Sequence, residues 1–118
     1  MKKMKIVFIL MLVGVILSGC IVYVSPDPEE TLTLSPGEVQ LFLTVGTKAP
    51  FLGNSTLYYE WFVDNVLVET DSPSFFYSPG ILDLGQRTIK CVVEVRNDKS
   101  DLLLWSDTVE WNVNVQIL

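Results

Sequence analysis

Apolar and polar side chains alternate with a period of two along most of the chain after residue 30, which is typical of half-buried β-strands. The clearest example is the stretch 57–68, in which Tyr59 and Trp61 share one face. The alternation breaks once, at Asp64-Asn65. Because Asp and Asn tolerate positive φ angles, we predict a β-hairpin that turns here and points the Trp61 indole into the core.

The same alternation predicts the other strands. Residues expected to share the inward parity are Leu32, Leu34, Val39, Leu41, Leu43, Val45, Ile89, Cys91, Val93, Val95, Trp105, Val109, Trp111, Val113 and Val115. Turn signals such as Ser35-Pro36-Gly37 separate these segments, and none has helical periodicity. The pattern predicts an all-β domain over 31–118, a sandwich of about 6–8 antiparallel strands, with Trp61, Cys91 and Trp111 in its structural core.

The first 19 residues have the organisation of an export signal, with a basic start at 2–5 followed by the apolar run 6–17. The run ends in Leu17-Ser18-Gly19-Cys20, which resembles the lipobox of prokaryotic lipoproteins. That resemblance implies thioether lipidation of Cys20 and cleavage before it. We therefore expect 1–19 to be a lipoprotein signal peptide, and the domain to be lipid-anchored at the extracytoplasmic face of the cell membrane.

Two alternatives to lipidation stay open. Cleavage by the general secretory route would leave Cys20 an ordinary small residue. Without cleavage, Ile6–Val24 is an uncharged run of 19 residues, long enough to cross a hydrocarbon core of roughly 30 Å as a helix. The preceding lysines would then stay in the cytoplasm and the domain outside. Two prolines and three acids in 24–30 predict a short extended tether. With lipidation, 20–30 would consist of the lipidated Cys20 and the tether that joins it to the domain.

The exported part of the chain is strongly acidic. The whole chain has a net charge of −6, from eight basic and fourteen acidic residues. Lys2, Lys3 and Lys5 lie in the signal segment, so the rest keeps five basic against fourteen acidic residues, a net charge of −9. Such a domain repels phosphate backbones, which disfavours nucleic-acid binding.

Four segments of the predicted sandwich are similar to immunoglobulin-like domains, and to the prokaryotic surface versions related to PKD (polycystic kidney disease) domains. They are Tyr59–Asn65, Phe75–Pro79, Asp83–Val95 and Trp111–Val115, within a match over residues 31–117. The resemblance implies that Trp61 is the core Trp of strand C. It also implies that Asp83 and Gly85 form the corner before strand F, and that Trp111–Val115 is the closing strand.

Two positions depart from antibody-type domains. Cys91 lies where one half of the immunoglobulin disulfide would be, but strand B offers only Leu41 and Leu43. Ile89 stands in place of the Tyr of the tyrosine corner. These departures favour the surface-protein class, with Cys91 as a buried small hydrophobe.

Candidate chemistry is sparse. The chain has no His, which removes the commonest general base and zinc ligand. Its Asp and Glu residues are spread over turns and strand faces, so we expect neither an enzyme nor a cofactor. The one metal candidate is a calcium site in the loop that holds Asn97, Asp98 and Asp101.

An apolar patch is a further candidate, because several large side chains have outward parity. They are Phe42, Tyr58, Phe62, Val92, Leu102 and Leu104. If their strands are neighbours, the patch would mark a partner site. We therefore expect a non-enzymatic, lipid-anchored module for adhesion or ligand capture, with a protein or glycan partner. The alternative is a structural accessory subunit that docks on a larger envelope complex.

Overall fold

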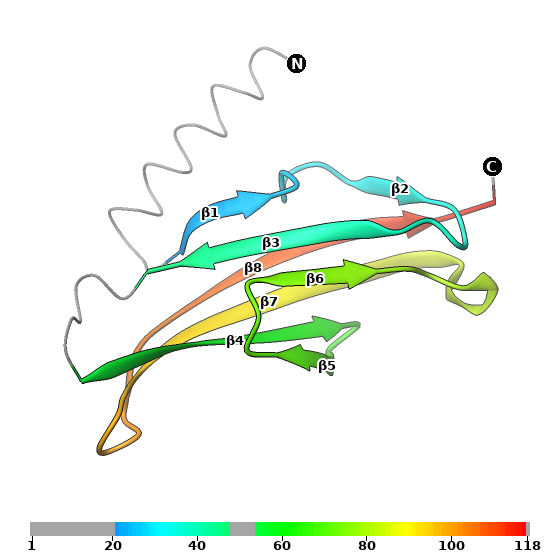
Figure 1. Ribbon diagram of the computed structural model, residues 1–118. Helices are drawn as coiled ribbons and strands as arrows, with labels where there is room; N and C mark the ends of the chain where they lie inside the picture. The colour runs from blue at the N-terminus through cyan, green and yellow to red at the C-terminus, as the bar shows by residue number, and fades with distance from the viewer. Residues whose placement is uncertain (1–20, 48–53, 118) are drawn as a thin grey trace, which may run out of the picture.

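The computed structural model describes residues 21–47 and 54–117, and this part of the chain contains eight β-strands and one short 3₁₀ helix (Figure 1). The elements are β1 (Ile21–Ser25), β2 (Leu32–Leu34), β3 (Gln40–Gly46), β4 (Ser55–Val63), β5 (Val66–Thr70), β6 (Ser74–Tyr77), η2 (Ile81–Asp83), β7 (Gly85–Asn97) and β8 (Leu103–Val115). The predicted all-β class is confirmed. The predicted signal segment and Cys20 lie outside the described residues.

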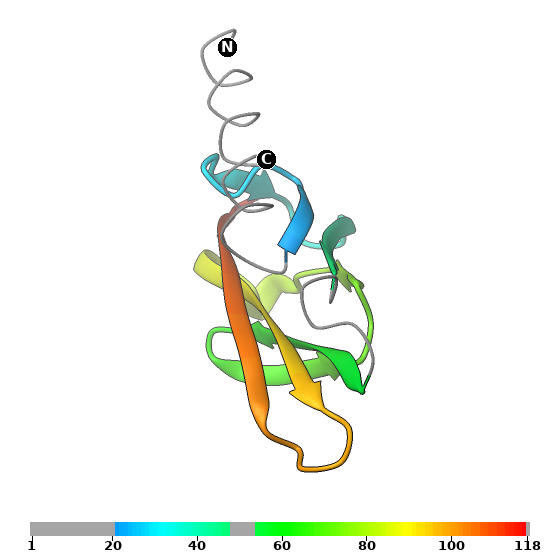
Figure 2. The ribbon, with the colours of Figure 1, turned by 90° about the vertical axis from the view of Figure 1, so that its left-hand side faces the viewer.

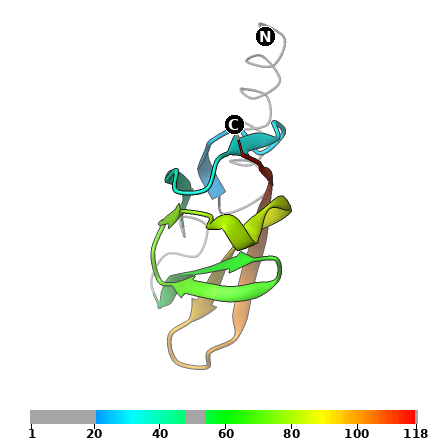
Figure 3. The same cartoon turned by 90° about the vertical axis from the view of Figure 1, so that its right-hand side faces the viewer.

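The strands form two sheets that pack face to face. One has three strands in the order β1-β3-β6, and the other has five in the order β2-β8-β7-β4-β5. All neighbours are antiparallel except β2 and β8, which are parallel. Views from the two sides show β7 and β8 side by side, joined by their hairpin loop at the lower end (Figures 2 and 3).

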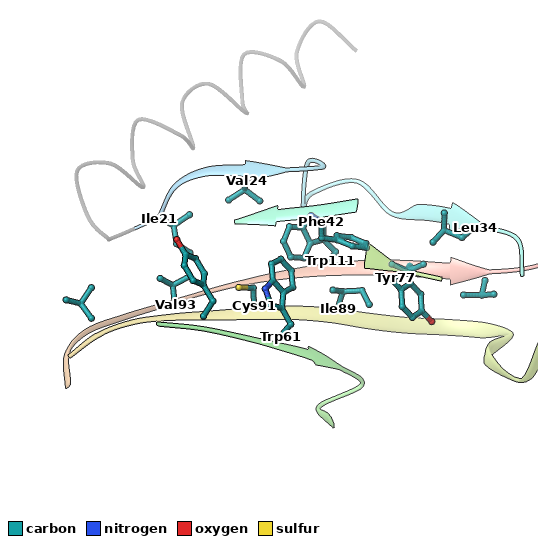
Figure 4. Close-up of a cluster of buried hydrophobic side chains, with 14 residues drawn as sticks. Ile21, Val24, Leu34, Phe42, Trp61, Tyr77, Ile89, Cys91, Val93 and Trp111 are labelled. Carbon is teal, nitrogen blue, oxygen red and sulfur yellow. The ribbon is translucent and has the colours of Figure 1, made fainter. Parts of the chain in front are cut away.

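The core is built around two stacked indoles, one from each of two strands of the larger sheet (Figure 4). Trp61 and Trp111 are fully buried, and their ring centroids lie 5.8 Å apart. Phe42 from the smaller sheet meets Trp111 edge-on, with a centroid distance of 4.9 Å. Because Phe42 and Trp111 belong to different sheets, their contact joins the two layers of the sandwich through aromatic rings.

Both indole N–H groups find acceptors, which burial requires. Trp61 Nε1 donates to the carbonyl of Ser72, and Trp111 Nε1 donates to the carbonyl of Pro26, each at 2.7 Å. The second bond spans 85 positions of the sequence. It joins the turn after β1 to β8, and so fixes the start of the domain to its last strand.

The β4–β5 hairpin turns at the predicted residues. Asp64 and Asn65 both have positive φ angles, 49° and 68°, as two-residue turns that match strand twist require. The Asp64 carboxylate accepts a hydrogen bond from the Thr88 amide at 2.9 Å and pairs with the Arg87 guanidinium at 2.8 Å. These contacts hold the turn against β7.

Because of the Asp64–Arg87 pair, we expect the stability of the fold to decrease in acid. Burial opposes ionisation of Asp64, but the bonds from Arg87 and Thr88 outweigh it and hold the pKa of this carboxyl below its ordinary value of 3.8. A lowered folded-state pKa adds stability at neutral pH that is lost as the pH falls through that pKa. We expect Asp64→Asn to lower the unfolding free energy at neutral pH by about 0.5–1 kcal/mol, since solvent screens this half-exposed pair.

Chemical denaturation at several pH values measures this effect. The difference between the wild type and Asp64→Asn should shrink towards the most acid conditions, where the wild-type carboxyl is also protonated. Glu29→Gln, which removes an exposed charge from the turn after β1, is the control. A difference that stays constant down to the lowest pH would contradict the account.

The segment predicted as a tether belongs in part to the sandwich. Residues 21–25 form β1, which pairs with β3, and Ile21 and Val24 are 2% and 9% exposed. The sandwich therefore begins directly after Cys20 and not at residue 31. The alternation Ile21-Val-Tyr-Val24 is short and apolar on both sides, so it looks like the continuation of the preceding hydrophobic run.

The facing predicted for β3 was wrong. Phe42 and Thr44 are fully buried, whereas Leu41, Leu43 and Val45 lie on the outer face of the smaller sheet. Both parities of this strand carry large apolar residues, so alternation does not determine which face is inside. The aromatic ring does, because Phe42 buries more area and meets Trp111.

Trp105 was expected on the same face as the core residue Trp111. It has the same parity as Trp111, but it is 40% exposed. It lies near the loop end of β8, opposite Val95.

Candidate functional site

The predicted lipidation site adjoins the sandwich directly. Cys20 lies outside the described residues, but the next residue, Ile21, is buried and pairs with Gly46 of β3. A group attached to Cys20 would therefore lie within one or two residues of a fixed strand. No flexible spacer would separate it from the smaller sheet.

Two side chains of the calcium candidate loop, Asn97 and Asp98, already accept hydrogen bonds, from within the loop and from β4. Asn97 Oδ1 accepts hydrogen bonds from the amides of Lys99 and Ser100, at 2.9 and 3.0 Å. Asp98 Oδ1 accepts a hydrogen bond from the Thr56 hydroxyl, and Asp101 has a positive φ of 59°. The loop thus has the internal bonding of a hairpin tip. Across the described residues, His, Cys, Asp and Glu form no group of three or more that suits a metal ion.

Cys91 is fully buried on β7, next to Trp61 on β4 (Figure 4). Burial raises the pKa of its thiol to about 12. The thiolate is the reactive form, so this thiol is inert in the folded protein and packs as a small hydrophobe.

A thiol-labelling experiment checks this assignment. At about pH 8, where an ordinary thiol is partly ionised, we expect a maleimide to leave Cys91 unmodified in the native protein and to label it fully in concentrated guanidinium chloride. Thr108→Cys supplies a matched exposed thiol on β8 and should label at once. Rapid native labelling of Cys91 would show that the site opens to solvent.

A depression of about 410 Å³ lies at the outer side of the larger sheet. Its lining comes from β4, β5, the bend after β5, β7 and the loop before β8: Tyr58, Tyr59, Glu60, Thr70, Asp71, Glu94, Arg96 and Asp101. Tyr58 is 38% exposed and pairs across the sheet with Glu94. A partly exposed aromatic ring beside polar groups is a common feature of binding surfaces.

Acids outnumber bases in this depression. Arg96 donates from Nε to Glu94 Oε1 and from Nη1 to the carbonyl of Asp101, both at 2.9 Å. The bond to Glu94 raises the pKa of the guanidinium further, so Arg96 is charged at every relevant pH. Arg96 is the one base among the eight lining residues, and the charge of Glu60 also raises its pKa. The surface therefore suits a ligand with positive charge or with several hydrogen-bond donors.

The predicted outward patch does not form. Phe42 is buried, while Lys90 Nζ lies 4.9 Å from the centroid of the Phe62 ring. Glu60 pairs with Val92 in the register of β4 and β7, so charged groups interrupt the apolar ones. The outer side of the larger sheet is mixed in character and not a continuous hydrophobic surface.

Sequence reasoning missed the depression because it depends on strand register. The outward parity of Tyr58, Glu60 and Glu94 is visible in the sequence. Only the observed pairing brings Tyr58 opposite Glu94, and only the β7–β8 loop brings Asp101 to Arg96. Neither the register nor the loop conformation follows from alternation.

Comparison with known proteins shows the fold. No protein-family model matches the chain, and no curated protein matches it significantly in sequence. A structure of the fibronectin(III)-like modules of CbhA from Clostridium thermocellum is similar, with a TM-score of 0.51 and 11% sequence identity. The similarity covers 79% of this chain and 96% of that chain. The fold is an immunoglobulin-like β-sandwich.

The immunoglobulin-like β-sandwich carries the depression on its five-stranded layer, and the start of β1, next to Cys20, on its three-stranded layer. The strand that follows the predicted attachment site and the polar depression therefore belong to different sheets. In the described residues, no helical segment has the length and hydrophobicity of a membrane span.

Proposed function

We propose that this protein is a non-enzymatic binding module, anchored by lipid on Cys20 at the extracytoplasmic face of the cell membrane. The observation that carries the proposal is the position of β1. Ile21 and Val24 are core residues of the sandwich, so the hydrophobic run from position 21 onward belongs to a strand. The first described residue of the sandwich follows the Cys of the lipobox directly.

The same observation weighs against an uncleaved transmembrane anchor. With Ile21–Val24 in the sandwich, the uncharged run shortens to the fifteen residues from Ile6 to Cys20. A helix of that length measures about 22 Å, less than the roughly 30 Å of hydrocarbon that it would have to cross. Lipid on Cys20 needs no such length, and two acyl chains hold a protein stably.

The binding role rests on the depression and on the fold. An immunoglobulin-like sandwich with a mixed, acidic outer sheet and a partly exposed Tyr58 provides a surface for a protein or glycan partner. The acidic surplus favours a partner with basic groups. A closer relation to PKD surface domains stays a prediction from the quoted segments.

An accessory subunit is the second candidate, and β5 favours it. This strand pairs only with β4, so its other edge is open. Val66, Leu67 and Val68 are 64%, 49% and 44% exposed. An open apolar edge is a template for pairing with a strand of another protein. Co-purification with one stoichiometric partner, lost in a Leu67→Pro variant, would favour this role.

The anchoring is tested by intact mass spectrometry of the membrane-extracted protein beside a Cys20→Ser variant. We expect a mature chain that starts at Cys20 and carries added diacylglyceryl mass, and we expect the variant to lose both the added mass and membrane retention. An unmodified full-length chain in the membrane fraction would overturn the proposal.

A further inference from the structure

The smaller sheet has no charge. None of the described residues of β1, β3 and β6 is Asp, Glu, Lys or Arg. The larger sheet, in contrast, carries charges on four of its strands, β4, β5, β7 and β8. The two sheets of the sandwich therefore differ in charge: the larger sheet carries charged side chains, and the described strands of the smaller sheet do not.

The outer surface of the smaller sheet is a continuous apolar face. We call it the apolar outer face, and its residues are Tyr23, Val39, Leu41, Leu43, Val45 and Phe76. Residues opposite each other in an antiparallel pair share a face, and the register pairs Tyr23 with Val45 and Leu41 with Phe76. Only serines, Ser25 and Ser74, flank Leu43.

The apolar outer face is exposed enough to be a contact surface for another molecule or for a membrane. Phe76, Val39 and Tyr23 are 65%, 62% and 43% exposed. Contiguous apolar patches of this kind on a soluble domain mark contact with a protein or a membrane. A second copy is disfavoured by charge, because two domains that each carry −9 without the signal segment repel one another.

The position of Cys20 identifies the occupant. Cys20 is one peptide bond from Ile21, about 3.8 Å between Cα atoms, and Ile21 begins the edge strand of this same sheet. Tyr23, two residues further, already belongs to the apolar outer face. The predicted anchor therefore enters the membrane at one end of the face, which brings the face to the bilayer at high effective concentration.

We propose that the apolar outer face lies flat on the lipid bilayer that holds the Cys20 anchor, with Tyr23 and Phe76 in the interfacial region. The inference rests on the proposed lipid anchoring. Aromatic side chains are enriched at this depth, and a charge-free sheet enters it without desolvating an ion. The orientation leaves the depression around Tyr58, on the other sheet, facing away from the membrane and open to a partner.

Position 76 lies at the far end of the apolar outer face, too far from Cys20 to be shielded from water by insertion of the anchor alone. Leu41, the partner of Phe76, lies five residues from Gly46, the partner of Ile21. At a rise of about 3.4 Å per residue, Phe76 is some 17 Å from the anchored end of the sheet. That exceeds the roughly 5–10 Å depth of interfacial insertion. Protection of position 76 therefore requires the whole sheet to lie on the bilayer.

The experiment uses the full lipidated protein in phosphatidylcholine vesicles, with a polarity-sensitive fluorophore on Phe76→Cys or, as the matched control, on the exposed Thr108→Cys of the opposite sheet. The buried Cys91 does not compete for the label. We expect blue-shifted emission at position 76, quenching by spin-labelled lipid, and iodide quenching lower than at position 108 by a factor on the order of three. Val39→Cys should behave like Phe76→Cys.

Three results would overturn the inference, and they are distinguishable. If the label at position 76 is as open to iodide as the label at position 108 while the protein floats with the vesicles, the anchor holds but the face points to water. If protection at position 76 disappears when the protein is diluted with lipid, a second copy covers the face. If the protein does not float with the vesicles, the lipid anchoring has failed and the inference falls with it.

Discussion

Replacing Trp111 by alanine should destabilise the domain more than any other single truncation in the core. The indole stacks on Trp61 at 5.8 Å, meets Phe42 at 4.9 Å and donates to the carbonyl of Pro26. Truncation leaves a cavity between the sheets and removes the donor from the partly buried carbonyl of Pro26. Such losses cost about 3–5 kcal/mol, a large part of the 5–15 kcal/mol that stabilise a typical domain.

Urea denaturation followed by circular dichroism measures the loss. Trp105→Ala is the matched control, because this Trp lies on the same strand and parity but is 40% exposed. We expect the control to lose less than about 1 kcal/mol. Equal losses in the two variants would mean that Trp111 is not the contact between the layers.

Placing a carboxylate at Val24 should have the second-largest effect. Val24 is 9% exposed on β1, and its partner in the register is the fully buried Thr44. In Val24→Asp the charged group would be desolvated with no base nearby on β1 or β3, neither of which carries a charge. We expect a loss of at least about 3 kcal/mol.

The control for Val24→Asp is Thr33→Asp, which introduces the same group at an exposed position of β2. Thermal unfolding of both variants should show a large drop in Tm for Val24→Asp and a small one for Thr33→Asp. A Tm for Val24→Asp close to the wild-type value would mean that residues 21–25 form a tether after all.

Several features could be predicted because local sequence and tertiary structure agree. The β4–β5 hairpin follows from alternation on either side of Asp64-Asn65, two residues that accept the positive φ angles of the turn. The burial of Ile89, Cys91, Val93 and Val95 follows from a strand with a strictly apolar side and a polar side. In these segments only one register is compatible with a buried face.

Other features could not be predicted, because the sequence pattern is compatible with two arrangements. In β3 both parities are apolar, so the choice of Phe42 over Leu41 depends on Trp111 across the sandwich. In β1 four apolar residues extend a hydrophobic run, and only the pairing with Val45 and its neighbours identifies them as a strand. The apolar outer face was missed as a consequence of both.

The depression could not be predicted either, because its formation depends on strand register and on the conformation of two loops. Its acids and Tyr58 come from two strands, β4 and β7, and from the loops after β5 and before β8, and they meet through pairings distant in sequence. Around the loop between β7 and β8, in contrast, nearness in sequence suggested a site at Asn97, Asp98 and Asp101. Those residues are close in sequence and look like a cation site, but Asn97 Oδ1 accepts hydrogen bonds from two amides of its own turn and Asp98 Oδ1 accepts one from the Thr56 hydroxyl of β4.

Hydrogen exchange at the N-terminus of the membrane-extracted protein, followed by mass spectrometry, tests the central claim most directly. The claim is that a lipid-bearing Cys20 leads straight into a strand of the sandwich. The account predicts that the peptide 20–30 carries the diacylglyceryl mass and that its Ile21–Ser25 amides exchange as slowly as those of β3. An unmodified peptide, or one that exchanges at the rate of an unfolded chain, would contradict it.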